Sequence, residues 1–232
     1  MDSWQKLIRV LTHEISNSIS PITSLANTTK KYFVRQDTGS VLKTEELDDA
    51  LLNKAVDSLD TIETTGRGLI DFVGKYRSLT ALPPPKFEKF PIRDMFSKLQ
   101  TLLKEEADSN AIVLEFNSSP NTLELTADFS LLEKVLINLI KNAFQALEKS
   151  RDGKVHVSAF KNIENRVIIT VKDNGGGIPS NIIDDIFIPF YTTKNNGSGI
   201  GLSLSRQIMR LHSGTITVNS IPNTETVFSL VF

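Results

Sequence analysis

The stretch Ala81-Leu82-Pro83-Pro84-Pro85-Lys86 interrupts the chain. Three consecutive prolines cannot continue a helix, and they push the residue before them out of helical geometry. Strand-like runs are scarce before this stretch, whereas alternating segments such as residues 154–158 and 166–171 follow it. We therefore predict an α+β chain of two domains, a helical one over residues 1–82 and an α/β one over residues 83–232.

The composition excludes several classes of protein. The 232 residues carry 26 Lys and Arg against 27 Asp and Glu, and they include no Cys. Balanced charge provides no field that would attract nucleic acid or a membrane surface, and no apolar run approaches the roughly 20 residues of a bilayer span. The absence of Cys excludes disulfides and thiolate metal sites. We expect no nucleic-acid partner, no direct membrane contact and a cytoplasmic location.

The helical domain shows heptad spacing in two segments. The first seam consists of Trp4, Ile8, Leu11, Ile15, Ser18, Ile22 and Leu25, and the second of Leu59, Ile62, Gly66, Leu69, Val73 and Tyr76. A polar stretch at residues 36–44 separates them, which predicts an antiparallel helical hairpin. Such a pair leaves apolar edges uncovered, so we expect a homodimer in which two hairpins form a four-helix bundle. The alternative is that the hairpin packs on its own α/β domain.

The α/β domain shows strand patterns near residues 87–91, 111–117, 122–127, 154–162, 166–172, 214–220 and 225–231. Helical patterns fall near residues 92–109, 129–149 and 201–212. The order lacks regular alternation of strand and helix. This favours a sandwich in which helices cover one face of a mixed sheet.

His13 and Glu14 are the first candidates for chemistry. His13 projects about 180° from the first seam, and Asn17 lies about 40° from His13, so the imidazole is expected to face solvent. A zinc site of the His-Glu-x-x-His type would need a second His where this chain has Asn17. A neutral imidazole oriented by a carboxylate can attack phosphorus, so the pair indicates a phosphoacceptor and its base, although an ordinary surface His is the alternative.

Two glycine-rich motifs lie downstream. Asp173 ends an apolar strand and precedes Gly175, Gly176 and Gly177, so a carboxylate that could accept a hydrogen bond from an exocyclic amine lies beside flexible backbone. The second motif opens a helix, where backbone amides favour phosphate, and it comprises Gly197, Gly199, Gly201 and Leu202. A turn and a flexible loop are the respective alternatives.

Asn138 and Asn142 share one face of an otherwise apolar helix. Buried amides are costly unless bonded, and their oxygens could hold a hydrated Mg²⁺ that bridges nucleotide phosphates. Capping of neighbouring backbone is the alternative. Between the two glycine motifs, the aromatic segment 186–194 ends in Lys194 and indicates a lid that brings a cation toward phosphates. His156 and His212 have no partner in sequence and are expected to be structural.

Together these motifs resemble the transmitter region of two-component sensor histidine kinases. His13 to Asn17 resembles the H-box, Asn138/Asn142 the N-box, Asp173 to Gly177 the first Gly-box, Phe187 to Lys194 the F-box and Gly197 to Gly201 the second Gly-box. The sequence is most similar to the nitrogen-regulation type, although Ser18 stands where that type commonly has Pro. The resemblance implies that His13 accepts phosphate, Glu14 is its base, Asn138 and Asn142 hold Mg²⁺, and Asp173 contacts adenine.

By this resemblance the chain is an ATP-dependent protein-histidine kinase that autophosphorylates His13 and passes the phosphoryl group to an Asp of a response-regulator receiver domain. Asn17 would position water or substrate in dephosphorylation of that partner. The run Pro83–Pro85 would be the hinge between the domains, and the chain would be a portion of a longer, membrane-anchored sensor. The alternatives are an ATPase of the gyrase, mismatch-repair and chaperone class, for which Asn138 replaces the usual water-activating Glu, and an inactive dimeric docking module.

Overall fold

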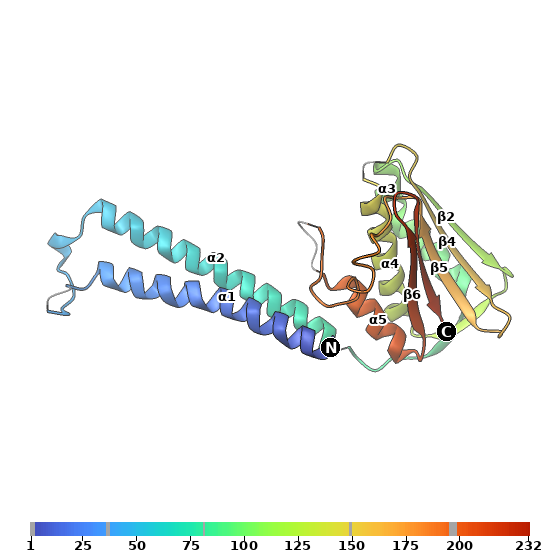
Figure 1. Ribbon diagram of the computed structural model, residues 1–232, viewed down its shortest axis with the longest axis horizontal. Coiled ribbons are helices and arrows are strands. Elements are labelled where there is room, and N and C mark those ends of the chain that lie inside the picture. The colour runs from blue at the N-terminus through green and yellow to red at the C-terminus, as the bar shows by residue number, and fades with distance from the viewer. Residues whose placement is uncertain (1–2, 36–37, 81, 149, 195–198) are drawn as a thin grey trace. The chain divides into compact units, whose positions relative to one another are not determined.

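The structure is a computed structural model that describes residues 3–35, 38–80, 82–148, 150–194 and 199–232 (Figure 1). For residues 3–11, 13, 14, 75 and 78–80 it describes the backbone alone. The chain divides into two compact units, a helical unit, Met1–Thr80, and an α/β unit, Ala81–Phe232. Within the described ranges, no helix combines the length and apolar character that crossing a membrane requires.

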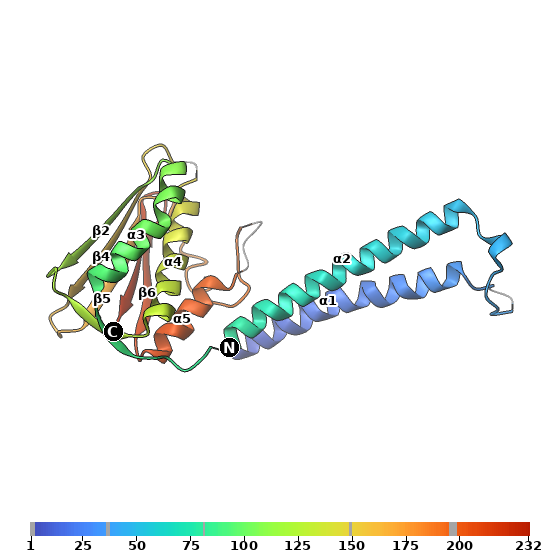
Figure 2. The same ribbon diagram turned by 180° about the vertical axis from the view of Figure 1, so that it is seen from behind.

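The helical unit is an antiparallel hairpin of α1 (Ser3–Tyr32) and α2 (Asp49–Thr80), as predicted (Figures 1 and 2). The connection contains a short 3₁₀ helix, Thr44–Glu46. It folds back on itself, since Leu42 N–H donates to the Phe33 carbonyl at 2.9 Å and Arg35 pairs with Glu46. The two long helices are therefore joined by a connection with its own hydrogen bonds.

The second predicted seam divides into two stripes. Ala55, Ile62, Leu69 and Tyr76, at seven-residue steps, are buried or half-buried. In contrast, Leu59 and Val73 are 54% and 49% exposed. A stripe of apolar positions wider than one helix contact cannot turn entirely toward a single neighbour. Part of the predicted seam therefore lies outside the contact with α1.

The α/β unit contains a mixed sheet covered on one face, which confirms the predicted fold class (Figure 2). Its elements are β1 (Glu88–Pro91), α3 (Ile92–Ser109), β2 (Val113–Ser119), β3 (Glu124–Ala127), α4 (Phe129–Ala146), β4 (Lys154–Lys161), β5 (Val167–Asp173), α5 (Gly201–Leu211), β6 (Thr215–Ile221) and β7 (Glu225–Val231). Strand order is β2-β4-β5-β7-β6, with β2 parallel to β4 and the other pairs antiparallel. β1 and β3 form a separate two-stranded sheet.

Helices α3, α4 and α5 lie on the same face of the five-stranded sheet (Figure 1). Helical spacing places the apolar side chains of α3 and α4 in one core, which includes the fully buried Leu99, Leu136, Leu139 and Ile140. Alternate residues of the strands, among them Val157 and Ile169, complete it. Each such side chain stabilises the fold by about 1.5–3 kcal/mol relative to exposure. The core thereby holds α4 rigidly against the sheet.

The three prolines belong to the α/β unit. Leu82, just before them, packs against its core, and the Lys86 N–H, just after them, donates to Asp128 Oδ2 at 2.7 Å. The residues on both sides of the prolines therefore contact the α/β unit, and the hinge at Pro83–Pro85 stays a prediction.

Candidate functional site

The candidate residues of the α/β unit converge on one polar face of α4. Asn138, Asn142, Gln145 and Ala146 follow one another at helical spacing on this face. Asn138 contacts the start of α5, Gln145 bonds Lys194, and Ala146 touches the loop after β5. The opposite side of α4 is buried in the core. This face of α4 therefore connects three segments that lie far apart in sequence.

Asn138 ties α4 to the first turn of α5. Its Nδ2 donates to Ser205 Oγ at 3.1 Å, and Ser205 Oγ donates in turn to the Gly201 carbonyl at 2.9 Å. A side chain at Gly201 would collide with the Asn138 amide oxygen. Gly201 is therefore required for the close approach of the two helices. Ser205, which is buried, gave no signal in the sequence.

Asn142 is half-buried between these contacts, and its amide has no hydrogen-bond partner among the described residues. Asn138 one turn earlier is bonded, so the two predicted amides differ in their surroundings. An amide that is partly shielded from water yet unpartnered is suited to a ligand, since shielding without a bond is costly. Asn142 therefore carries an amide on this face with both its oxygen and its nitrogen free to bind a ligand.

Asp173 is the last residue of β5, and it is buried. Its Oδ1 accepts a hydrogen bond from the Gly175 N–H at 2.9 Å. Burial raises the pKa of Asp173 to about 6, although the Gly175 N–H and the charge of Lys194 oppose the rise. The sheet register places the buried Thr226 of β7 directly beside Asp173. Sequence reasoning missed Thr226, because only the strand pairing brings it there.

The glycines after Asp173 allow two close approaches. A Cβ at Gly175 would lie 3.0 Å from the Ala146 carbonyl oxygen on α4. Gly177 has a φ of +68°, and a Cβ there would lie 2.5 Å from the Ile221 carbonyl oxygen in the β6–β7 turn. A Cβ at Gly176 would meet nothing within 4 Å. The loop is thus held between α4 and that turn.

The segment 186–194 begins in the core and ends on α4. Phe187 is buried, and the guanidinium of Arg206 lies 4.6 Å from its ring centroid. Lys194 Nζ donates to Gln145 Oε1 at 2.5 Å. Partial burial of this ammonium group lowers the pKa of Lys194, while the carboxylates of Glu148 and Asp173 oppose that effect. The segment therefore brings the Lys194 ammonium group close enough to Asp173 for the two charges to interact.

The second glycine motif begins at a close backbone contact. The Phe190 N–H donates to the Gly199 carbonyl at 2.8 Å, and a side chain at Gly199, whose φ is +66°, would collide with the Phe190 backbone. Gly197 lies outside the described residues. Leu202 lies in the first turn of α5. Its side chain packs on the core, so only its backbone can contribute to an anion site there. No described side chain caps this helix, which leaves its first N–H groups available to an anion.

His13 and Glu14 lie in α1, but the placement of their side chains is outside the described residues, so the solvent-facing direction of His13 stays a prediction. The Asn17 side chain is exposed on the same helix.

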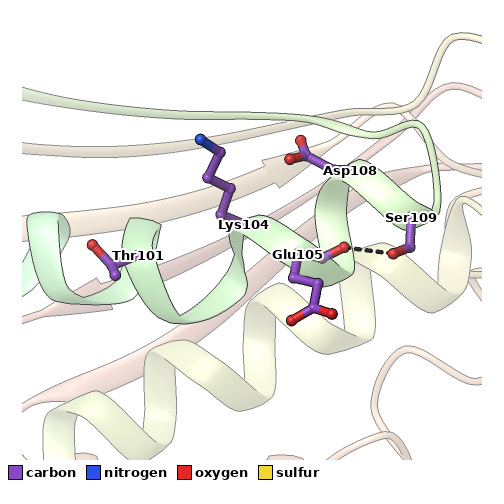
Figure 3. A pocket seen from close by; sticks show the side chains of 5 residues that line it. All are labelled: Thr101, Lys104, Glu105, Asp108 and Ser109. Atoms are coloured by element: carbon purple, nitrogen blue, oxygen red, sulfur yellow. Dashed lines mark hydrogen bonds between the residues drawn. The ribbon is translucent and has the colours of Figure 1, made fainter.

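Two surface hollows of about 380 Å³ each lie apart from this arrangement. The first is lined by Thr101, Lys104, Glu105, Asp108 and Ser109 of α3 alone, and Figure 3 shows its side chains spread along the helix. The dashed bond there is within the helix, from Ser109 Oγ to the Glu105 carbonyl at 2.7 Å. The second is lined by Lys89, Pro120, Thr122, Leu123, Glu124 and Lys161. Neither hollow contains a predicted site residue.

The arrangement is similar to that of known proteins. Residues 127–232 match the family model described as histidine kinase-, DNA gyrase B- and HSP90-like ATPase. The sensor histidine kinase ZraS of Salmonella typhimurium is 33% identical over 218 residues, which are 94% of this chain and 43% of that protein. The kinase AtoS of Escherichia coli is 29% identical over 97% of this chain and 34% of its own length. The chain thus spans less than half the length of these relatives.

Among solved structures, the catalytic domain of histidine kinase ThkA aligns with a TM-score of 0.57 and 30% identity, covering 63% of this chain and 95% of that one. A complex of ThkA with a response regulator aligns over 98% of this chain and 60% of that one, with a TM-score of 0.62 at 24% identity, a likeness of fold. The fold and the motif order define a transmitter of the two-component type. The chain belongs to the histidine kinase family.

Gly177→Ala should lower the free energy of unfolding by about 2–4 kcal/mol, because the new Cβ must enter the β6–β7 turn at a left-handed backbone position. Gly176→Ala is the matched control and should change it by less than about 0.5 kcal/mol, since its Cβ meets nothing. Chemical denaturation measures both. Equal effects of the two substitutions would contradict the proposed contact.

Asp173→Asn should raise the free energy of unfolding at pH 7 by on the order of 1–3 kcal/mol, because it removes a buried charge. The folded-state pKa lies above the usual value, so the ionised carboxylate destabilises the fold above about pH 6, and this cost disappears as the pH falls toward 4. Urea denaturation between pH 4 and 8 should show the gain fading on acidification. A gain at Asp173 that persists at pH 4 would refute the explanation.

Proposed function

We propose that this chain is the ATP-dependent kinase core of a two-component sensor, in which ATP bound by the α/β unit phosphorylates His13. The proposal is supported most directly by the polar face of α4, where the unpartnered amide of Asn142 lies between the contacts to α5 and to Lys194. Around that face are a buried acceptor, Asp173, and an uncapped helix start at Gly201. These are the groups that an adenine amine and a row of phosphates require.

Each residue has a proposed role toward the nucleotide. Asp173 accepts from the adenine amine, and the amides at the start of α5, with Gly199 and Gly197, surround the phosphates. Lys194 adds a mobile positive charge when the nucleotide displaces its bond to Gln145. The roles of Gly175 and Gly177 are to hold the loop beside Asp173, since their missing side chains make room for α4 and for the β6–β7 turn.

The amide pair on α4 fits a magnesium ion through Asn142. Its oxygen is unpartnered, and Mg²⁺ commonly keeps several waters and takes few protein ligands. Asn138 is engaged by Ser205 and abuts Gly201, so we assign it to holding the phosphate-binding helix start, with ligation through its oxygen as a second role. When bound, Mg²⁺ would neutralise charge on the phosphates.

The acceptor side of the reaction uses His13 and Glu14. Glu14 accepts the proton from one imidazole nitrogen, and the other nitrogen attacks the γ-phosphorus in line with the leaving oxygen. An N–P bond forms, the bond between the γ-phosphorus and the bridging oxygen breaks, and ADP leaves. Asn138 replaces the Glu that activates water in the related ATPases, and an amide cannot serve as a general base. This difference favours transfer to His13 over hydrolysis.

We propose a response-regulator receiver domain as the acceptor of the phosphoryl group from His13. A kinase of the same fold, ThkA, has been solved with a response regulator. Asn17, exposed one turn after His13, would position water when the partner is dephosphorylated. Because ZraS and AtoS extend well beyond the matched region, we further propose that this chain is the cytoplasmic portion of a longer sensor.

We propose a homodimer through the helical unit. Leu52, Val56, Leu59, Ile70 and Val73 form an exposed apolar stripe on α2 at heptad-like steps. It lies beside the stripe that packs toward α1. Shielding such a stripe from water requires another apolar surface to cover it. A second copy of the chain offers an identical stripe across a twofold axis.

Incubation with γ-labelled ATP and Mg²⁺ should give label on the protein that is labile to acid and stable to alkali. His13→Ala should abolish it, because no other residue is proposed to attack phosphorus. The control His156→Ala, on the sheet strand β4, should keep the label. Label that persists without His13 would refute the assignment, and steady phosphate release without label would favour the ATPase. Absence of nucleotide binding would instead indicate an inactive docking module.

Ile70→Glu should weaken the dimer by more than about 100-fold, since a twofold axis places the unpaired charge in the interface twice. Light scattering across a dilution series measures the shift toward monomer. Ile163→Glu is the control, because Ile163 is fully exposed on the α/β unit, and it should leave the mass unchanged. A dimer that survives Ile70→Glu at every dilution would contradict this interface.

A further inference from the structure

The segment Leu82–Phe87, here called the strap, joins the two units and contains the three prolines. Its first residue packs against the core of the α/β unit. Its last two residues are also attached there: the Lys86 N–H donates to Asp128 Oδ2 at 2.7 Å, and the Phe87 ring lies 5.2 Å from that of His212. A proline run is stiff. The strap is thus a stiff piece held at both ends by one unit.

Asp128 performs two tasks with one carboxylate. Oδ1 accepts from the Leu131 N–H at 2.9 Å and caps α4, while Oδ2 receives the Lys86 N–H. Burial alone would raise the pKa of Asp128, but these backbone donors, together with the Ser130 N–H, outweigh it and lower the pKa. The donors therefore hold the carboxylate in its ionised form, which is the form that can accept both bonds.

His212 connects the same point to the end of α5. Its Nε2 accepts from the Asp128 backbone N–H at 2.9 Å, so the ring proton is on Nδ1, which donates to the Ile208 carbonyl at 2.8 Å. The ring is buried and meets Phe87 and Phe232 edge to face. The His212 side chain therefore contacts the strap, the start of α4, the end of α5 and Phe232, which follows the last strand.

The composition of this cluster exceeds the needs of helix capping. Capping α4 needs only Oδ1, and the end of α5 is already satisfied by backbone bonds of the His212 N–H to Ile208 and Met209. The second carboxylate oxygen and the His212 ring both face the strap. Phe87 is 53% exposed, so its position over His212 adds little to the core and mainly orders the strap.

We infer that Asp128 and His212 are positioning residues for phosphoryl transfer: they anchor the strap to the nucleotide-binding unit, so that movement between the units occurs upstream of Leu82. This inference rests on the proposed kinase function. α4 carries Asn142 and α5 carries the phosphate-binding start, so anchoring the strap to both helices links the point of attachment to the nucleotide site. A loosened strap would allow more orientations of the donor, and fewer of them would be productive.

Asp128→Asn tests the inference with little change in shape. Asn still caps α4, but its amide group now faces the Lys86 N–H, donor against donor. Amide hydrogen exchange at Lys86, the first strap amide after the prolines, should accelerate by about tenfold or more. The affinity for an ATP analogue should stay within about twofold, and the maximal rate of His13 labelling should fall at least about fivefold with an unchanged KM. An unchanged or increased rate would overturn the positioning role.

Phe87→Ala is the second variant. Because the Phe87 side chain is largely exposed, its truncation should leave the fold intact. Phe160→Ala, 38% exposed on the sheet, is its matched control. Phe87→Ala should reproduce the faster Lys86 exchange and the slower labelling, and Phe160→Ala should change neither. Unaltered Lys86 exchange in both Asp128→Asn and Phe87→Ala would refute the anchor. A wild-type chain that gives no label would refute the kinase proposal instead, while Lys86 exchange would still decide the anchoring.

Discussion

The polar face of α4 is the constraint on which the α/β unit depends. One side of this helix is fixed in the core, and the other presents Asn138, Asn142, Gln145 and Ala146 in a line. The start of α5, Lys194 and the loop after Asp173 are all placed by contact with that line. Because a helix is stiff, the side chains along it keep their spacing, whatever the conformation of the segments that contact it. The unpartnered Asn142 in its middle is the feature on which we base the proposal that this face binds a ligand.

Asp173 illustrates the cost of such a site. Its carboxylate is buried beside Thr226 at a strand end, where ionisation is opposed by burial, and only the Gly175 N–H and the charge of Lys194 compensate. A protein selected for stability alone would place an uncharged residue there. The backbone strain at Phe190, whose φ is +67°, is a second free-energy cost. Phe190 lies in the segment 186–194, which carries Lys194. Both are consistent with a site that is completed by a ligand.

The prolines connect this site to the rest of the chain in an unexpected way. Three consecutive prolines between two domains suggest a hinge, but stiffness and attachment at both ends make them part of the α/β unit. Asp128 and His212 attach the strap to the start of α4 and to the end of α5. In our proposal, the segment that separates the units in sequence also links the proposed nucleotide-binding helices, α4 and α5, to the connection between the units.

The amino-acid sequence by itself determined the helices and strands, the break at the prolines and the order of the motifs, because periodicity, proline and glycine act locally. The hairpin, the mixed sheet and membership in the histidine kinase family were all predicted from these signals and are confirmed. What only the tertiary structure decided are contacts between distant residues: Thr226 beside Asp173, Ser205 on Asn138, and His212 bridging Asp128 and Phe87. Strand register and helix packing create these pairs across 53 to 125 residues of chain, and no local pattern encodes them. The same holds for Gly177 and Gly201, whose lack of a side chain is explained only by the neighbour each one meets.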